Sequence, residues 1–188
     1  MKNQIVHFKT VDRLKDWLTS HSINTDVWNC DQAKSIERLF EEIVKGESYI
    51  QDDPPLRIVN VVQVLVKKGD NYLLELEQEI DDRRKRKRHI PPSEKMQPGE
   101  DCLIAAKRCL VEELGTTDKD IHLLSGLCEP TISKRNSRSY PGLKTQYRLY
   151  HVEVAVKNLP DENFWTKETS FVNGQEIIRS HYWGWGQL

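Results

Sequence analysis

The spacing of apolar side chains predicts two helices near the start of the chain, over residues 11–20 and 31–46. We expect Asp31 to cap the second helix and Gly46 to end it. In both segments the apolar residues recur at intervals of three and four, which places them on one helical face. These residues are Val11, Leu14, Trp17 and Leu18 in the first segment, and Ala33, Ile36, Leu39, Phe40 and Ile43 in the second.

Beyond residue 56 the pattern changes to runs rich in β-branched residues, which favour strands. Residues 57–68 and 71–80 flank the turn Gly69-Asp70-Asn71 and predict a hairpin. Two more strands are expected over residues 121–129 and 146–157, a short helix over 170–180, and a linker over 49–56. The order of elements predicts an α+β domain in which helices cover a mixed sheet. We expect an N-terminal helical extension over residues 1–55 and one domain over residues 56–188.

Charge and hydropathy narrow the class of protein. The chain has 188 residues, and its 28 basic and 29 acidic residues give a formal net charge of -1. This balance argues against a surface devoted to nucleic acid or acidic membrane, so any contact with a polyanion must be local. No apolar run approaches the roughly 20 residues that span a bilayer, and no signal-like stretch opens the sequence. We therefore expect a cytoplasmic protein without membrane contact, with its four cysteines reduced.

The segment from residue 91 to 116 carries the candidate chemistry. Between Gly99 and Gly115 the spacing predicts a helix with one buried stripe, formed by Leu103, Ala106, Leu110 and Leu114. Cys109, Glu112 and Glu113 stand at i, i+3 and i+4, so we expect them on a neighbouring face. Adjacent carboxylates repel each other unless a cation lies between them, and Mg²⁺ prefers oxygen ligands. The alternative is a solvated helix end, because paired glutamates are common on exposed helices.

This segment resembles the Nudix signature between Glu94 and Thr116. Its family positions are matched, at the family spacing, by Glu100, Arg108, Leu110, Glu112, Glu113 and Gly115, and the lead-in Pro92, Lys95, Pro98 and Gly99 is also similar. Three positions depart from the pattern. Glu94 replaces a glycine, Cys109 replaces a glutamate that binds metal in the family, and Thr116 replaces an apolar residue. A neutral thiol is a poor ligand for a hard cation, so the substitution at Cys109 bears most directly on function.

The resemblance implies a Nudix-like α/β/α sandwich and a set of site residues. Glu100, Glu112 and Glu113 would bind Mg²⁺, or alternatively Mn²⁺, and Arg108 would orient an acidic group beside it. We place Glu168, in an expected loop, as the candidate general base, with a solvated loop glutamate as the alternative. Nudix enzymes generally cleave the pyrophosphate linkage of a nucleoside diphosphate derivative with metal-activated water.

Further candidates for substrate binding lie outside the motif helix. The basic run 83–88, with Arg84, Arg86 and Arg88, could guide phosphates or RNA to the site, or form a solvated loop. Tyr140 could stack on a base, or form a turn with Pro141 and Gly142. Lys95 in the lead-in is also a candidate contact to the substrate.

Two hypotheses follow from these residues. The first is a magnesium-dependent hydrolase that cleaves the pyrophosphate linkage of a nucleoside diphosphate derivative. The second is a catalytically impaired Nudix-fold module that binds a nucleotide or RNA ligand. Glu100, Arg108, Glu112 and Glu113 favour the first, and Cys109 favours the second.

Overall fold

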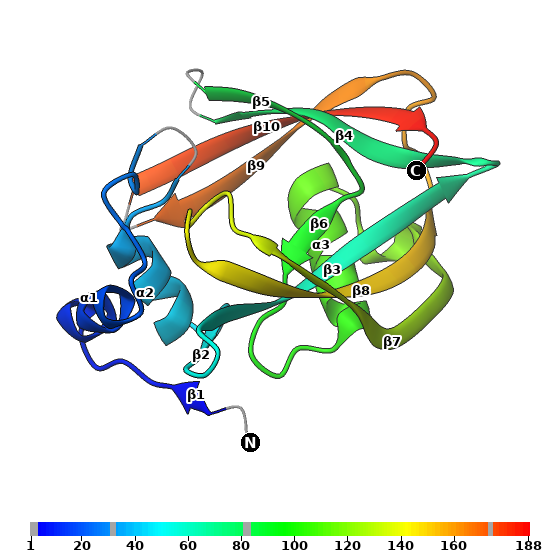
Figure 1. Ribbon diagram of the computed structural model, residues 1–188. Coiled ribbons are helices and arrows are strands. Elements are labelled where there is room, and N and C mark those ends of the chain that lie inside the picture. Colours follow the sequence, from blue (N-terminus) through cyan, green and yellow to red (C-terminus); the bar gives the residue numbers. More distant parts are fainter. Residues whose placement is uncertain (1–3, 31–32, 81–83, 173–174) are drawn as a thin grey trace. The chain divides into compact units, whose positions relative to one another are not determined.

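The computed structural model describes residues 4–30, 33–80, 84–172 and 175–188 (Figure 1). The chain divides into two compact units, each assembled from three stretches of sequence. The first unit consists of residues 1–61, 95–99 and 130–149, and the second of residues 62–94, 100–129 and 150–188. Residues 1–55 therefore share a unit with two later stretches, and the expected boundary at residue 55 stays a prediction.

The two helices of the first unit begin at hydroxyl caps. Helix α1 (Val11–Ser20) has the expected bounds, and the Thr10 hydroxyl accepts a hydrogen bond from the Arg13 N–H. Helix α2 (Ile36–Val44) begins later than expected, because the Ser35 hydroxyl caps it through the Arg38 N–H. Asp31, the expected cap, lies outside the described residues.

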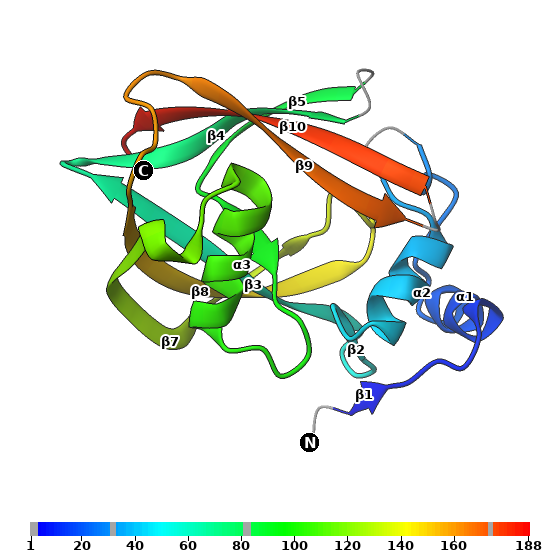
Figure 2. The same cartoon turned by 180° about the vertical axis from the view of Figure 1, so that it is seen from behind.

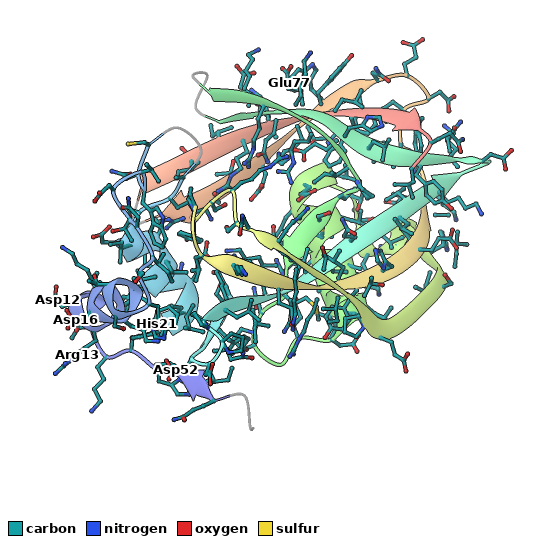
Figure 3. All side chains as sticks on the ribbon, viewed as in Figure 1. Asp12, Arg13, Asp16, His21, Asp52 and Glu77 are labelled. Atoms are coloured by element: carbon teal, nitrogen blue, oxygen red, sulfur yellow. The ribbon has the colours of Figure 1, made fainter. Side chains whose placement is uncertain are left out.

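Short antiparallel strands complete the N-terminal part of the first unit. Strand β1 (Ile5–Val6) pairs with β2 (Tyr49–Gln51), and β2 pairs with the start of β3 (Leu56–Lys68). The expectation of a linker over 49–56 was therefore wrong at β2, where Ile50 enters the core. Figure 3 labels His21 after α1 and Asp52 after β2, and their Nε2 and Oδ1 atoms lie 3.7 Å apart. The buried core of this unit consists of Leu14, Trp17, Leu18, Trp28, Leu39, Ile50, Tyr140 and Leu143.

The second unit contains a four-strand arrangement in the order β5, β4, β10, β9 (Figures 1 and 2). Strand β4 (Asn71–Ile80) forms the predicted hairpin with the end of β3, and also pairs with β5 (Arg84–Ile90). The expected helix over 170–180 was wrong, because this sequence lies in β9 (Phe164–Val172) and β10 (Gln175–Gly186). The Asn173-Gly174 pair in this sequence is typical of a two-residue hairpin turn, and that signal outweighs the helical spacing of the neighbouring apolar residues.

Helix α3 (Cys102–Leu114) packs against β9 within the second unit. The remaining elements are β6 (Ser93–Lys95), the 3-10 helix η1 (Asp118–Asp120), β7 (Ile121–Asn136) and β8 (Lys144–Val156). The described residues contain three α-helices, and the strand pairs with a described register are antiparallel. These elements confirm the α+β class in the described residues. The α/β/α arrangement of layers stays a prediction.

Two expectations from composition can be compared with the structure. Cys102 forms a disulfide, so the expectation of four reduced cysteines was wrong. Within the described ranges, no helix is long and apolar enough to cross a membrane.

Candidate functional site

Local signals fix both ends of the motif helix. The Asp101 side chain accepts a hydrogen bond of 2.8 Å from the Leu103 N–H, which caps the first turn of α3. At the other end Gly115 adopts the left-handed conformation, with φ of 66°, and its N–H donates to the Val111 carbonyl. Glycine adopts this conformation without a Cβ penalty, which explains why the helix ends at the predicted residue.

Helix α3 divides the carboxylates of the motif between two environments. Cys109 and Glu113 lie on the buried side, whereas the Glu112 side chain is 44% exposed. The spacing predicts Cys109, Glu112 and Glu113 on one face, but residues 112 and 113 are about 100° apart around a helix. The buried side of α3 consists of Cys102, Ala105, Ala106, Cys109, Leu110, Glu113 and Leu114, whereas Leu103 of the expected stripe is only half-buried.

Arg108 binds two of the expected metal ligands. Its Nε and Nη2 atoms donate to the two carboxylate oxygens of Glu100 at 2.9 and 3.0 Å, and Nη1 donates to Glu112 Oε2 at 3.3 Å. The hydrogen bonds to Glu100 raise the pKa of Arg108, so the guanidinium stays charged. Glu100 and Glu112 therefore have an internal cation in this structure.

Cys109 and Glu113 both lie in surroundings that favour their neutral forms. Cys109 is 0% exposed, and burial, reinforced by the negative charge of Glu113, raises the pKa of its thiol. Burial also raises the pKa of Glu113 well above its usual value, and the nearby Glu75 raises it further. His181 opposes that shift with its positive charge. The buried face of α3 thus offers a neutral thiol and a carboxyl group that resists ionisation.

A chain of hydrogen bonds attaches the end of α3 to the sheet. The Trp183 indole N–H donates to the Thr166 hydroxyl at 2.7 Å, and that hydroxyl donates to the Glu113 carbonyl at 2.5 Å. Strands β9 and β10 therefore fix the position of Glu113.

An ion-pair network lies across the strands of the second unit. We define it by five side chains: Glu75 on β4, Arg88 on β5, Glu168 on β9, and Arg179 and His181 on β10. Glu75 lies between two of its cations, with Oε2 2.7 Å from Arg88 Nε and Oε1 2.7 Å from His181 Nδ1.

His181 also faces the second carboxylate of the network. Its Nε2 atom lies 3.3 Å from Glu168 Oε2, an ion-pair distance that does not meet hydrogen-bond geometry. Burial alone would lower the pKa of His181, but the two carboxylates outweigh it and raise the pKa from 6.5 to about 9. The imidazole is therefore a buried cation at neutral pH.

Glu168 lies in strand β9, so its expected position in a loop was wrong. Arg179 Nη1 lies 3.0 Å from its Oε1 atom. Although burial favours the neutral form, His181 and Arg179 lower the pKa of Glu168 below its usual value. An ionised carboxylate can accept a proton, but a lowered pKa makes Glu168 a weaker base.

The basic run forms strand β5 where it is described, so the interpretation as a loop was wrong. Lys85 lies 3.4 Å from Glu79 on β4, and Figure 3 labels Glu77 on the same hairpin. Arg86 and Arg88 both donate to Gln78 Oε1. Cross-strand partners thus neutralise or bind much of this basic strand. The side chain of Arg84 lies outside the described residues.

Lys95 and Tyr140 belong to the first unit. The Lys95 ammonium pairs with Glu42 at 2.7 Å and with Glu47 at 3.2 Å. Tyr140 is completely buried, with its ring 5.1 Å from that of Trp28. A base could stack on Tyr140 only after this core contact opened.

The predicted magnesium donors do not fit a magnesium site in this arrangement. Mg²⁺ demands an octahedral set of oxygen ligands. Glu100 and Glu112 bind Arg108, Glu113 lies on another side of the helix, and Cys109 offers a neutral sulfur. Across the described ranges, no group of three or more His, Cys, Asp or Glu residues is arranged to hold a metal ion.

Sequence reasoning missed Glu75, Arg179 and His181. The histidines gave no signal of their own, because no two have metal-ligand spacing along the chain. Alternation along 71–80 places Glu75 on the same strand face as Glu77 and Glu79, so no pattern indicated that it is buried.

Comparison with known proteins gives little further guidance. No protein-family model and no curated protein matches the sequence. Among solved structures, one match is a NUDIX hydrolase from Nitrosomonas europaea, with 23% identity and a TM-score of 0.37, covering 68% of this chain and 71% of the other.

Proposed function

We propose that this chain binds a nucleotide-type ligand that carries a diphosphate, and that it does so without magnesium-dependent hydrolysis. One observation carries the proposal: cations of the protein itself pair with the carboxylates around the motif helix. Arg108 binds Glu100 and Glu112, and the ion-pair network supplies cations to Glu75 and Glu168.

The arginines of the network suit a phosphate group. The side chains of Arg88 and Arg179 are 23% and 26% exposed, and each is held by a carboxylate. A guanidinium has five N–H donors in a fixed plane, so an arginine fixed by one carboxylate can still donate to a phosphate. Holding the side chain before the ligand arrives lowers the entropy lost on binding. The resemblance of the motif to the Nudix signature supports a nucleoside diphosphate derivative as the ligand.

The second candidate is magnesium-dependent cleavage of a pyrophosphate linkage, which the same resemblance implies. The observation in its favour is Glu112, a part-exposed carboxylate at its family position. Its weakness is the donor set around Glu113, in which Cys109 is neutral and buried.

A panel experiment separates the two candidates. ADP-ribose, dinucleoside polyphosphates, nucleotide sugars, NAD, nucleoside triphosphates and capped RNA are each incubated with the protein, in EDTA and in Mg²⁺. Calorimetry measures binding, and chromatography of the same samples measures turnover. Saturable binding of one ligand in EDTA, with no product, supports the proposal. Product that forms only with Mg²⁺ supports the second candidate.

A pair of variants locates the binding site. Arg88→Gln removes a cation of the network, and Lys85→Gln removes a cation from the same strand that pairs with Glu77 and Glu79. We expect Arg88→Gln to weaken binding roughly tenfold or more, the size of one charge-assisted hydrogen bond. Lys85→Gln should bind like the wild type. Equal losses in both variants would contradict a site at the network.

A further inference from the structure

We propose that His181 and Arg88 take the place of a metal ion as the counter-charges of this site, so that the wild-type protein has no saturable magnesium site. The inference rests on the proposed function and deepens it, because it names what replaces the divalent cation at that site.

His181 lies between two carboxylates. Its ring is 1% exposed, and its two nitrogens face Glu75 at 2.7 Å and Glu168 at 3.3 Å. Opposite charges this close, away from water, interact strongly because little solvent screens them. One side chain from β10 therefore joins carboxylates from β4 and β9, which is the bridging role that a cation would have.

Two arginines add further positive charge beside the same carboxylates. Arg88 Nε lies 2.7 Å from Glu75, and Arg179 Nη1 lies 3.0 Å from Glu168. With His181 protonated, each carboxylate of the network faces two cations. A divalent ion placed beside them would add positive charge where the protein has already supplied it, and a like charge disfavours its binding.

Helix α3 offers an incomplete set of ligands to a metal ion. The Cys109 thiol is buried and neutral, and it stands where a carboxylate would complete the set. The Glu112 carboxylate accepts a hydrogen bond from Arg108. An incoming Mg²⁺ thus meets the buried carboxyl group of Glu113, with the charges of Glu75 and Glu94 acting on it, beside the cations of the network.

If internal cations replace the metal ion, exchanging charges should restore a metal site. Cys109→Glu adds the missing carboxylate, and His181→Gln removes the bridging cation while keeping a side chain that can donate a hydrogen bond to Glu75. Neither change alone is enough: the first leaves the internal cation in place, and the second leaves the ligand set incomplete.

Calorimetric titration with Mg²⁺, without nucleotide, tests the inference on four proteins: the wild type, the two single variants and the double variant Cys109→Glu/His181→Gln. We expect no saturable binding to the wild type. We expect the double variant to bind Mg²⁺ roughly tenfold or more tighter than either single variant. Its Tm should rise with Mg²⁺ and fall back with EDTA. One Mg²⁺ bound per wild-type chain, or a double variant no better than Cys109→Glu, would overturn the inference.

Two further proteins keep the test decisive if His181→Gln does not fold. Cys109→Glu/Arg88→Gln removes Arg88, the other cation that pairs with Glu75, and should also gain magnesium binding. The Arg88 side chain is part-exposed, so its replacement should disturb the core less. Cys109→Glu/Lys85→Gln is its control and should bind like Cys109→Glu. The titration of the wild type tests the inference even if no variant folds. The Mg²⁺ titration contains no nucleotide, so its result is independent of the nucleotide panel. A wild-type protein that binds neither Mg²⁺ nor nucleotide contradicts only the proposed function. A wild-type protein that binds both contradicts only this inference.

Discussion

His181 Nδ1 lies 2.7 Å from Glu75 Oε1, and both side chains are almost fully buried. The contact joins β10 to β4, and the two residues are 106 positions apart in the sequence. An imidazole in this position is a permanent cation at neutral pH, since the surrounding carboxylates raise its pKa to about 9. The stability of the second unit should therefore depend on the protonation of this one side chain.

Stability of the second unit should fall as pH rises from about 6.5 to about 9. The pKa of His181 is raised on folding from 6.5 to about 9, so its contribution is complete below 6.5 and is lost as pH rises through the folded value. A shift of that size corresponds to roughly 3 kcal/mol. Denaturant unfolding followed across this pH range measures the loss. The raised pKa of Glu113 acts in the same direction, because the folded state holds its proton more tightly.

Two variants separate the contributions of these groups. Glu113→Gln removes one titrating group and should leave a decline between pH 6.5 and 9. His181→Gln should be less stable at pH 6 and show a flatter profile. A wild-type profile that stays level over this range would contradict the assignment of a buried imidazolium.

Glu42 should be the most sensitive polar residue of the first unit. Its carboxylate lies 2.6 Å from Arg57 Nη2 and 2.7 Å from both Lys34 Nζ and Lys95 Nζ. Glu42→Gln leaves the buried Arg57 and two part-exposed lysines without their common partner, and the loss at Arg57 should reduce the free energy of unfolding by about 3–5 kcal/mol. Urea titration measures the change.

The matched control is Glu41→Gln, which removes the neighbouring carboxylate. Glu41 pairs with Arg38 on a part-exposed surface, where such pairs contribute about 1 kcal/mol or less. Similar losses in the two variants would contradict a special role for Glu42. Although burial opposes it, the three cations hold the pKa of Glu42 far below its usual value, so its contribution should be lost only as pH falls below about 4.5.

A fragment of residues 56–188 should not fold stably. Residues 1–55 supply Glu42, together with Leu14, Leu18 and Leu39 of the buried core of the first unit. Removing them would expose apolar surface and leave Arg57 without its carboxylate partner. Circular dichroism with thermal melting tests this expectation. A cooperative transition like that of the full chain would instead support an independent domain beginning at residue 56.

The basic strand should contribute to RNA binding through fewer charges than its sequence suggests. Replacing Arg84, Arg86 and Arg88 with Ser should weaken binding of single-stranded RNA and lower the salt slope by roughly 0.7 for each phosphate that the protein no longer neutralises. Lys85→Ser should change the slope less, because Glu77 and Glu79 already pair with this ammonium. Affinity measured by fluorescence anisotropy at several salt concentrations checks both. An unchanged slope in the triple variant would leave β5 with a purely structural role.

Local signals explain the parts of the fold that could be predicted from the sequence. Thr10 and Gly115 mark helix ends through their own hydrogen bonding and backbone conformation, and the Gly69-Asp70-Asn71 turn joins the predicted hairpin. The hairpin of β9 and β10 was missed because Ile178, seven residues after Phe171, also fits a helical spacing. Periodicity alone does not distinguish strand from helix over so few residues.

The candidate site was predicted only in part, for a different reason. Glu100, Arg108 and Glu112 lie within 13 residues; Arg108 and Glu112 stand at i and i+4 on α3, and Glu100 lies just before the helix. Glu75 and His181 meet only through the pairing of β4 with β10, whose register no local pattern reveals. The identity of Cys109 was visible in the sequence, whereas its complete burial depends on how α3 packs against the sheet.

The most direct test of nucleotide binding without magnesium is calorimetric titration of the wild type with ADP-ribose, NAD and a nucleoside triphosphate, first in EDTA and then in Mg²⁺. The recovered ligand is analysed by chromatography after each titration. We predict that at least one of these ligands binds with the same Kd in both buffers and is recovered intact. Binding or cleavage that requires Mg²⁺ would contradict this prediction.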